Sequence, residues 1–318
     1  MVTKSAKIET TPDIVVGSHY FEQRYLYAFA TQGELINHVR TQALTDEFAR
    51  IEKIQADWQA LQPKVQQLIQ TESGLADKAV PEDLPNEFDQ ILQKTREDAL
   101  FKKTFSALPT KFSLVEIDKL VAAQRTVNLG YVKELKKKYA HRKKLKDLIE
   151  ICVSPTRDMP PIQHLEVTNN THVFSSPNLD LRFLGAFLKK LTPDDLEFAA
   201  MGGLPAAAVV SFVGYGGAPV NIFHVGGRLI INNGFHRVYA LRSNGVTKIP
   251  VVLQTVNNWQ LEVPPQVGGL PREYLLSHPR PVMMKDFFEK DFCITLKAKD
   301  RVKIITIQTN AGQFDAPS

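Results

Sequence analysis

The sequence predicts an α+β fold, and three observations carry that prediction. Apolar residues recur every three or four positions over residues 44–71, which is the spacing of an amphipathic helix. Between residues 207 and 256, β-branched segments separated by glycine turns indicate strands. Within that region one strand passes directly into a short helix at Gly234. Helices and strands are therefore expected to occupy different parts of the chain.

Changes in these patterns divide the chain into three parts. A helical N-terminal extension is expected over residues 1–110, because Leu108-Pro109-Thr110 interrupts the helical pattern there. An α/β domain is expected over residues 111–256, and a C-terminal loop and β-hairpin segment over residues 257–318, where proline and glycine pairs are frequent.

The composition is that of an ordinary globular chain. Of the 318 residues, 43% are hydrophobic and 23% are charged. No apolar run approaches the ~20 residues that span a bilayer, and residues 1–16 lack the apolar centre of a secretory signal. We therefore expect a cytoplasmic protein that does not enter a membrane. Cys152 and Cys293 are isolated, which favours reduced packing residues over a disulfide or a metal site.

The charge is distributed unevenly. Residues 1–100 hold 10 Lys and Arg against 16 Asp and Glu, whereas the remaining residues hold 29 against 18. An acidic front on a basic body is consistent with an anionic ligand or with nucleic acid.

The N-terminal extension is predicted to contain two helices. The first carries an apolar stripe that favours packing within the chain over helix-mediated dimerisation: Leu44, Phe48, Ile51, Ile54, Trp58, Leu61, Val65 and Leu68. Thr45 is placed to cap it, and Pro63 is expected to kink or divide it. A second helix is expected over residues 88–105.

A basic helix is expected over residues 129–151. Its lysines and arginines could neutralise phosphates: Lys133, Lys136, Lys137, Lys138, Arg142, Lys143, Lys144 and Lys146. The same segment also carries apolar residues that must pack, so the alternative is a solvated basic face.

The region after this helix is longer than a small α/β domain needs. Over a hundred residues separate Arg125 from Gly234, which predicts an insertion near residues 155–203 with a helix at residues 180–191. The insertion could form a lid, a partner surface or a surface embellishment without function.

The most informative segment follows the insertion. Strands are expected over residues 207–212, 220–225 and 228–232, with a turn at Gly226-Gly227. A helix from Gly234 through Leu241 and a strand over residues 249–256 follow. Gly214-Tyr215-Gly216-Gly217 is expected to form a flexible loop near a ligand, and residues 292–296 and 302–307 to form a hairpin.

The chemistry is expected where the strand ends in Asn232-Asn233-Gly234. A helix that starts there presents unpaired backbone N–H groups, and the helix dipole favours an anion. Gly234 would let a ligand approach the backbone, while His236 and Arg237 add side-chain donors. The alternative is that Gly234 only permits a turn and Arg237 only pairs with a surface carboxylate.

The segment Ile230-Ile231-Asn232-Asn233-Gly234-Phe235-His236-Arg237-Val238-Tyr239-Ala240-Leu241, with its core G-x-H-R-x-x-A, resembles the signature of the ParB/sulfiredoxin superfamily. Asn244-Gly245 and residues 249–252 continue the likeness. Residues 114–120 with Gln124-Arg125 resemble the opening strand and Gln/Arg segment of ParB-like domains. The resemblance covers about residues 112–256.

This resemblance implies a small α/β fold in which the helix that opens at Gly234 cradles nucleotide phosphates. It implies CTP or ATP, usually with magnesium, as the ligand. The nucleotide-binding residues that it implies are Gln124, Arg125, Asn233, Gly234, His236 and Arg237. It assigns no catalytic residue.

The chain also departs from the family pattern. Phe235 stands where sulfiredoxins carry their reactive cysteine, which argues against sulfinic-acid repair. Asn233 stands where many relatives have an acidic residue or glycine, which puts metal-linked chemistry in doubt. One arginine and a histidine replace the doubly basic motif of chromosome-partitioning proteins, so the choice between CTP and ATP stays open. No helix-turn-helix is recognised after residue 256.

Other polar residues have plain interpretations. Glu116 and Asp118 are expected to be solvated carboxylates at a strand end rather than a catalytic pair. His164 and His172 lack a standard metal-ligand spacing, so no metal site is assigned.

Three functions follow from the sequence. The first is a nucleotide-binding ParB-like protein that acts as an NTPase or phosphotransferase. The second is a nucleic-acid-binding protein or ParB-like nuclease that uses the basic helix. The third is a noncatalytic assembly module that binds a protein partner through the N-terminal helices and the inserted segment.

Overall fold

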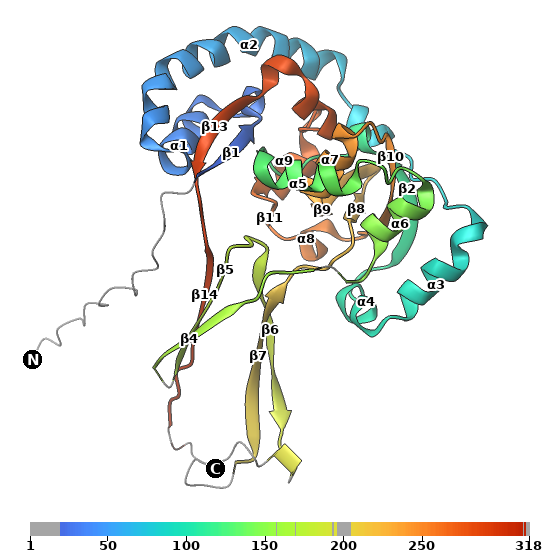
Figure 1. Cartoon of the computed structure of the whole chain (residues 1–318), viewed down its shortest axis with the longest axis vertical. Coiled ribbons are helices and arrows are strands. Elements are labelled where there is room, and N and C mark those ends of the chain that lie inside the picture. The colour runs from blue at the N-terminus through green and yellow to red at the C-terminus, as the bar shows by residue number, and fades with distance from the viewer. Residues whose placement is uncertain are drawn as a thin grey trace, which may run out of the picture.

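The computed structural model describes residues 20–318 apart from 157, 169, 193, 196–204, 314 and 316–318. The segment in which a signal sequence was not expected, residues 1–16, lies outside them. Helices and strands are mixed, as predicted for an α+β protein. Figure 1 shows a body of helices and sheets from which an arm of long strands projects. No helix in the described ranges is both long and apolar enough to cross a bilayer.

A four-stranded mixed sheet forms the centre of the body. Its order is β2 (Thr110–Glu116), β10 (Lys248–Thr255), β8 (Asn221–Val225) and β9 (Arg228–Asn233). β10 is antiparallel to β2 and parallel to β8, and β8 forms a hairpin with β9 through Gly226-Gly227. The strands predicted for residues 220–256 are thus confirmed.

Helices cover this sheet because its strands are apolar along most of their length. α6 (Leu145–Val153) packs on β10, α7 (Phe235–Ser243) belongs to the same core, and α5 (Leu129–Tyr139) packs on α7 and β1. Val251 and Val252 of β10 are fully buried, and Cys152 of α6 and Leu241 of α7 belong to the same apolar core. A strand buried on both faces reads as a continuous apolar run, as β10 does.

The basic segment predicted as one helix over residues 129–151 forms two helices. α5 ends at Tyr139 and α6 begins at Leu145, because the chain at Lys144 is extended (φ −69°, ψ 147°). The apolar residues of each helix then face the core separately.

The two ends of the chain meet in a second sheet. β1 (Tyr20–Tyr25) pairs with β13 (Ile294–Lys299) on one side and with β3 (Thr126–Asn128) on the other. α1 (Gln32–Gln42) and α2 (Ile51–Thr71) pack beside it, and their Leu35 and Ile54 share a core with Leu296. The N-terminal part is therefore not purely helical, since it contributes a strand that the C-terminal segment completes.

Three details of the N-terminal part differ from the sequence prediction. Pro63 does not divide α2, because it lies on the exposed face where water can satisfy the backbone carbonyl that it leaves unpaired. Thr45 begins a 3₁₀ turn rather than capping α2. The single helix expected over residues 88–105 is split into α3 (Asp89–Glu97) and α4 (Ala99–Thr104), because Asp98 caps α4.

The arm contains the inserted segment. β4 (Gln163–Thr168), β5 (Thr171–Ser176) and β14 (Lys303–Gln308) form a three-stranded sheet in the order β14-β5-β4. Beside it, β6 (Leu181–Lys190) and β7 (Ala207–Tyr215) form a two-stranded ribbon. Figure 1 shows both sheets extending away from the body.

Two predictions for these strands are wrong. The helix expected at residues 180–191 is strand β6, because β7 supplies a pairing partner along its whole length. The hairpin expected between residues 292 and 307 is absent, since β13 pairs with β1 and β14 pairs with β5. The strands β13 and β14 were themselves predicted, but each pairs with a strand that lies far away in the sequence.

The segment between β10 and β13 is rich in loops. It holds only short elements: α8 (Trp259–Glu262), β11 (Gln266–Val267), β12 (Leu270–Pro271) and α9 (Arg272–Ser277), followed by 3₁₀ turns at Met284–Phe288 and Lys290–Phe292.

Candidate functional site

The candidate site is the turn that joins β9 to α7. Gly234 occupies this turn in the left-handed region, with φ +90°. A Cβ atom there would lie 2.9 Å from Cγ2 of Val220 and 3.1 Å from Nη2 of Arg237. Only glycine fits this backbone without displacing its neighbours.

Asn233 holds the turn in place. Its Oδ1 accepts a hydrogen bond from the N–H of Gly234 at 2.9 Å, and its Nδ2 donates to the carbonyl of Gly217. The helix begins immediately afterwards, and Val238 donates the first intrahelical bond, to the carbonyl of Gly234 at 3.0 Å. The N–H groups of Phe235, His236 and Arg237 therefore form the first turn, which lacks intrahelical acceptors.

His236 links this turn to the start of a second helix. Its Nε2 accepts a hydrogen bond from the N–H of Asn128 at 3.1 Å, and its ring meets that of Tyr131 edge-on at 5.6 Å. Burial lowers the pKa of His236 to about 4, so the ring is neutral at pH 7. With Nε2 as acceptor, the proton resides on Nδ1. The side chain expected from the sequence to donate to a ligand is thus a neutral ring whose Nε2 accepts from Asn128.

The two helices run in parallel with their N-termini side by side. Asn128 is the N-cap of α5, where its Oδ1 accepts from the N–H of Tyr131 at 3.0 Å. At the other end, Asn244, the C-cap of α7, donates from Nδ2 to the carbonyl of Lys136 at 3.0 Å. The contacts therefore join start to start and end to end. The positive ends of two helix dipoles lie together, which favours an anion more than either helix alone.

Arg237 lies beneath the turn rather than facing solvent. Its side chain is buried, and its Nη1 donates to the carbonyl of Ile151 in α6 at 3.1 Å. Its Nη2 lies 3.1 Å from the position that a Cβ atom on Gly234 would take. The sequence predicted a side-chain donor for a phosphate at this position, and Nη1 of that side chain is engaged by the carbonyl of Ile151.

Gln124 and Arg125 precede β3, which leads into α5, but their side chains turn elsewhere. Nε2 of Gln124 donates to the carbonyl of Thr126 at 2.6 Å. Arg125 pairs with Glu34 of α1 at 3.0 Å and lies over the ring of Tyr274. Although burial acts in the opposite direction, hydrogen bonds from Thr31 and Arg125 hold the pKa of Glu34 below its usual value.

The structure thus brings Asn233, Gly234 and His236 together at the helix starts and places Arg237 behind them. Gln124 and Arg125 lie just before the adjoining strand, but Gln124 is engaged with the carbonyl of Thr126 and Arg125 with Glu34 of α1 and Tyr274 of α9. Asn128 and Tyr131 were missed in the sequence. The signal for Asn128 was available, since asparagine between a strand and an apolar helix is a preferred N-cap.

The nearby carboxylates are engaged in ion pairs. Asp118 receives two hydrogen bonds from Arg242, at 2.7 and 2.9 Å, and Glu116 pairs with Lys119 at 2.5 Å. Among the residues with described positions, no group of three or more His, Cys, Asp or Glu side chains could hold a metal ion. His164 and His172 contact each other on the arm, with 3.2 Å between ring nitrogens.

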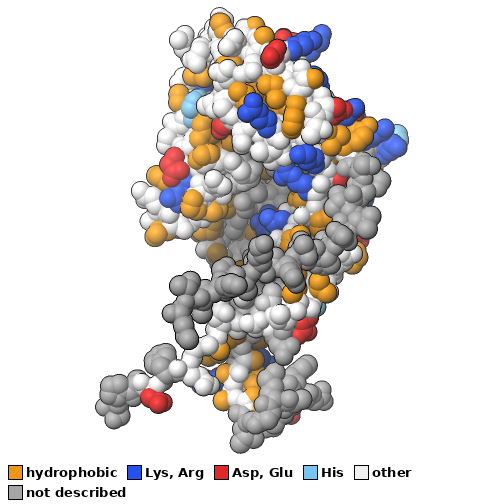
Figure 2. Space-filling model, turned by 90° about the vertical axis from the view of Figure 1, so that its left-hand side faces the viewer, with side chains coloured by type: hydrophobic (Ala, Val, Ile, Leu, Met, Phe, Trp, Pro, Cys, Tyr) orange, Lys and Arg blue, Asp and Glu red, His pale blue; other side chains and the backbone are white. Residues whose placement is uncertain are grey.

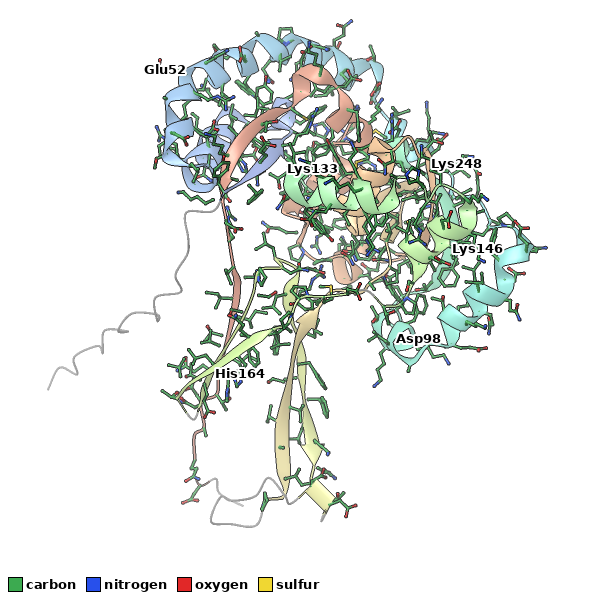
Figure 3. The ribbon with its side chains drawn as sticks, in the orientation of Figure 1. Glu52, Asp98, Lys133, Lys146, His164 and Lys248 are labelled. Atoms are coloured by element: carbon green, nitrogen blue, oxygen red, sulfur yellow. The ribbon has the colours of Figure 1, made fainter. Side chains whose placement is uncertain are left out.

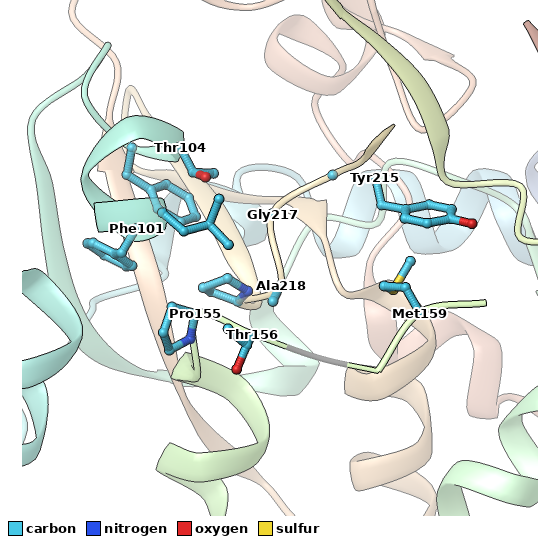
Figure 4. A pocket seen from close by; sticks show the side chains of 12 residues that line it. Phe101, Thr104, Pro155, Thr156, Met159, Tyr215, Gly217 and Ala218 are labelled. Atoms are coloured by element: carbon cyan, nitrogen blue, oxygen red, sulfur yellow. The ribbon is translucent and has the colours of Figure 1, made fainter. Parts of the chain in front are cut away.

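A pocket of about 200 Å³ lies on the other side of the loop that Asn233 holds (Figure 4). Phe101 and Thr104 of α4 form one wall, and Met159 and Tyr215 lie across from them. Gly217, whose carbonyl accepts from Asn233, also lines it. None of the six residues predicted to bind nucleotide lines this pocket. Its lining is mainly apolar.

A lysine surface flanks the paired helices. Its members are exposed, and none forms an ion pair within the described part of the chain: Lys133, Lys136, Lys137, Lys138, Lys143, Lys144 and Lys146. Figure 3 shows Lys133 on α5 and Lys146 on α6. Arg142 is set apart from this group because it pairs with Glu150.

Comparison with known proteins leaves these features to be interpreted by themselves. No protein-family model matches the chain, and neither a curated protein nor a solved structure matches it significantly.

Proposed function

We propose that this chain is a ParB-like nucleotide-binding protein whose paired helix starts hold the phosphates of the nucleotide. The observation that carries this proposal is the parallel packing of α5 and α7, joined at their N-termini by Asn128 and His236. First-turn N–H groups and two aligned dipoles are suited to a phosphate. The sequence resemblance at residues 230–241 supports the same assignment.

CTP or ATP is the proposed ligand, and magnesium would accompany it on the phosphates. The side chains at the turn do not themselves suit a metal ion, because Asn233 is engaged through both Oδ1 and Nδ2. Asp118, the carboxylate that precedes this region in sequence, is held by Arg242. We therefore propose binding, and assign neither hydrolysis nor phosphoryl transfer to a particular residue.

The test uses Gly130, which is exposed in the first turn of α5. Gly130→Asp would place a carboxylate beside both helix starts. A first-turn aspartate stabilises a helix by about 0.3–1 kcal/mol but repels a phosphate, so folding and binding should change in opposite directions. Gly130→Asn is the control, because it has the same shape without the charge.

Calorimetric titration with ATP, CTP, GTP and UTP, with and without magnesium, would measure the effect. We expect one or more nucleotides to bind the wild type, Gly130→Asp to weaken that binding about tenfold or more, and Gly130→Asn to change it much less. Failure of all four nucleotides to bind the folded wild type would contradict the proposal. Equal losses in both variants would place the ligand elsewhere.

The lysine surface favours a second function, the binding of nucleic acid. Seven exposed lysines that form no ion pair with the described residues supply positive charge suited to a phosphate backbone. This function is compatible with the first, because most of these lysines lie in the last turn of α5 or after it and not at the helix starts. It would supply affinity that does not depend on base sequence.

Salt dependence distinguishes this function. Changing Lys136, Lys137 and Lys143 to Gln should weaken the binding of a duplex oligonucleotide. A plot of the logarithm of the association constant against the logarithm of the salt concentration should also become shallower, by about 0.9 for each phosphate that the protein no longer neutralises. The control changes three other exposed lysines, Lys53, Lys94 and Lys102, to Gln. Fluorescence anisotropy at several salt concentrations would measure both triple variants. The same slope in both would remove the lysine surface from the interaction.

A further inference from the structure

A second pocket, of about 350 Å³, lies among α3, α4 and the start of β2. Three buried phenylalanines, Phe101, Phe105 and Phe112, supply its apolar lining. The ring centroid of Phe101 lies 4.7 Å from that of Phe105 and 5.5 Å from that of Phe112, so the three rings hold one another in place. We call them the phenylalanine trio. The volume of the pocket falls within the range of about 300–1,000 Å³ that small-ligand sites occupy.

Three cations from three different elements line the same pocket. Arg96 belongs to α3, Lys102 to α4 and Lys111 to β2. Among the described residues that line the pocket, none is Asp or Glu. Within the described part of the chain, neither Arg96 nor Lys102 forms an ion pair. Lys111 lies 3.8 Å from Asp83, whose side chain is 93% exposed, so water screens that pair. The pocket therefore gathers positive charge that its own lining does not neutralise.

This distribution of charge differs from that on another side of the molecule. Figure 2 views the chain from the side that lies on the left of Figure 1, and there Lys and Arg side chains are interspersed with Asp and Glu side chains. The helices α3 and α4 lie on the right of Figure 1, away from that face. A cleft lined by charge of one sign and by apolar walls concentrates the electrostatic potential, so we expect an anion in the pocket.

The position of Arg96 suits an anion that offers several oxygens. Its Cζ lies 5.1 Å from the centroid of the Phe112 ring, and this cation–π contact holds the guanidinium at the pocket. A planar guanidinium can donate to two oxygens of one phosphate, whereas a lysine ammonium acts as a point charge. Arg96, Lys102 and Lys111 together can therefore serve the three free oxygens of a phosphate group.

We propose that this pocket binds a small aromatic phosphate monoester, with its ring against the phenylalanine trio and its phosphate among Arg96, Lys102 and Lys111. A phosphate monoester carries three acceptor oxygens and a charge near −2 at pH 7, which matches three cations. A phosphate without a ring would leave the apolar lining uncovered, and a neutral ring would leave the cations without a counter-charge.

The size of the pocket favours a free small molecule over a segment of a partner protein. All three cations line one pocket whose volume is near the lower end of the range for small-ligand sites. None of its lining residues belongs to the turn at Gly234, so this inference is independent of the proposed nucleotide site.

Calorimetric titration of the full-length chain at pH 7.5 with three probes would test whether both the ring and the phosphate are recognised. The probes are phenyl phosphate, methyl phosphate, which has the charge without the ring, and phenol, which has the ring without the charge. We expect phenyl phosphate to bind about tenfold or more tightly than either of the others. Its affinity should fall as the pH drops below about 6, where the monoester loses its second negative charge.

Two triple variants would locate the binding. The pocket variant carries Arg96→Gln, Lys102→Gln and Lys111→Gln. The control variant carries Arg40→Gln, Lys94→Gln and Lys103→Gln, which removes the same charge from exposed positions outside the pocket, two of them on α3 and α4. We expect the pocket variant to lose about tenfold or more in affinity for phenyl phosphate and the control to stay within about twofold of the wild type. Thermal melting would verify folding, and Lys102→Gln alone would replace a triple variant that does not fold.

Several results would overturn the proposal. Failure of the folded wild type to bind phenyl phosphate would remove the site. Equal binding of phenol would leave a pocket that does not select an anion, and equal binding of methyl phosphate would leave surface charge alone. Equal losses in the two triple variants would place the ligand outside the pocket. A phosphotyrosine peptide that bound more than about tenfold more tightly than phenyl phosphate would reassign the pocket to a partner protein.

Discussion

Gly234 and His236 shape the same turn in different ways. Gly234 permits a backbone conformation in which Val220 and Arg237 leave no room for a side chain. His236 supplies an acceptor to the N–H of Asn128, which would otherwise be an unpaired donor beside two helix starts. Because this acceptor requires the neutral ring, the connection between α5 and α7 depends on pH.

Two buried histidines should make the protein less stable in acid. Burial lowers the pKa of both His38 and His236 from 6.5 to about 4. Between these values the unfolded chain binds protons that the folded chain does not. Their stabilising effect is therefore complete above about pH 6.5 and is lost as the pH falls toward 4, by up to about 1.4 kcal/mol per pH unit for each histidine.

Urea denaturation at several pH values would measure this effect. His236→Gln keeps an acceptor for Asn128 but cannot titrate in this range, so it should reduce the pH dependence of the unfolding free energy by up to half of the combined contribution of His38 and His236. The matched variant His38→Gln should have a similar effect, since its partner Gln23 can also bond to an amide. An unchanged slope in both variants would contradict the assigned pKa values.

At the scale of elements, local pattern predicted strands and helices well where a single period was present. β8, β9, α7 and β10 follow this rule, and the turn at Gly234 was located from sequence. β6 does not, because its apolar residues 181, 184 and 188 fit a helical period as well as a strand. Its pairing with β7 decides the outcome, and local periodicity carries no information about that pairing.

Asp98 also decides where a helix begins, and the apolar pattern of the sequence did not show this. Its carboxylate accepts from the N–H of Phe101 at 2.9 Å and starts α4, where a single helix had been predicted (Figure 3 labels the residue). Asp98→Ala should lower the free energy of unfolding by about 1 kcal/mol, because the cap is lost. Asp83→Ala removes an exposed carboxylate that forms only a 3.8 Å ion pair, and should cost little. Chemical denaturation would compare them, and equal costs would argue against the cap.

At the scale of the whole molecule, the sequence contained the strands but not their long-range partners. β1 and β13 lie at opposite ends of the chain, and β14 returns to complete a sheet begun by the insertion. The candidate site was predicted only in part, because sequence pattern again identified its local features but not its tertiary contacts. Its turn is local, whereas the neighbouring start of α5 and the diversion of Arg125 toward Glu34 are tertiary features.

A buried ionic cluster joins these distant parts. Arg280 is fully buried, donates to both oxygens of Asp286 at 2.6 Å, and reaches Glu72 just after α2 at 2.8 Å. Asp286 is itself buried, so removal of Arg280 would leave an uncompensated carboxylate in the core. Arg280→Ala should therefore destabilise the protein by about 3–5 kcal/mol.

The exposed pair between Lys64 and Asp291, with 3.7 Å between charged atoms, is the control for Arg280. It also joins α2 to the C-terminal segment, but Lys64→Ala should cost at most about 1 kcal/mol because water already screens the pair. Urea denaturation would compare the two variants by the midpoint and slope. If Arg280→Ala cost no more than Lys64→Ala, the ionic cluster would not be what holds α2 to the C-terminal segment, and apolar packing around Phe29 and Phe292 would have to carry that role.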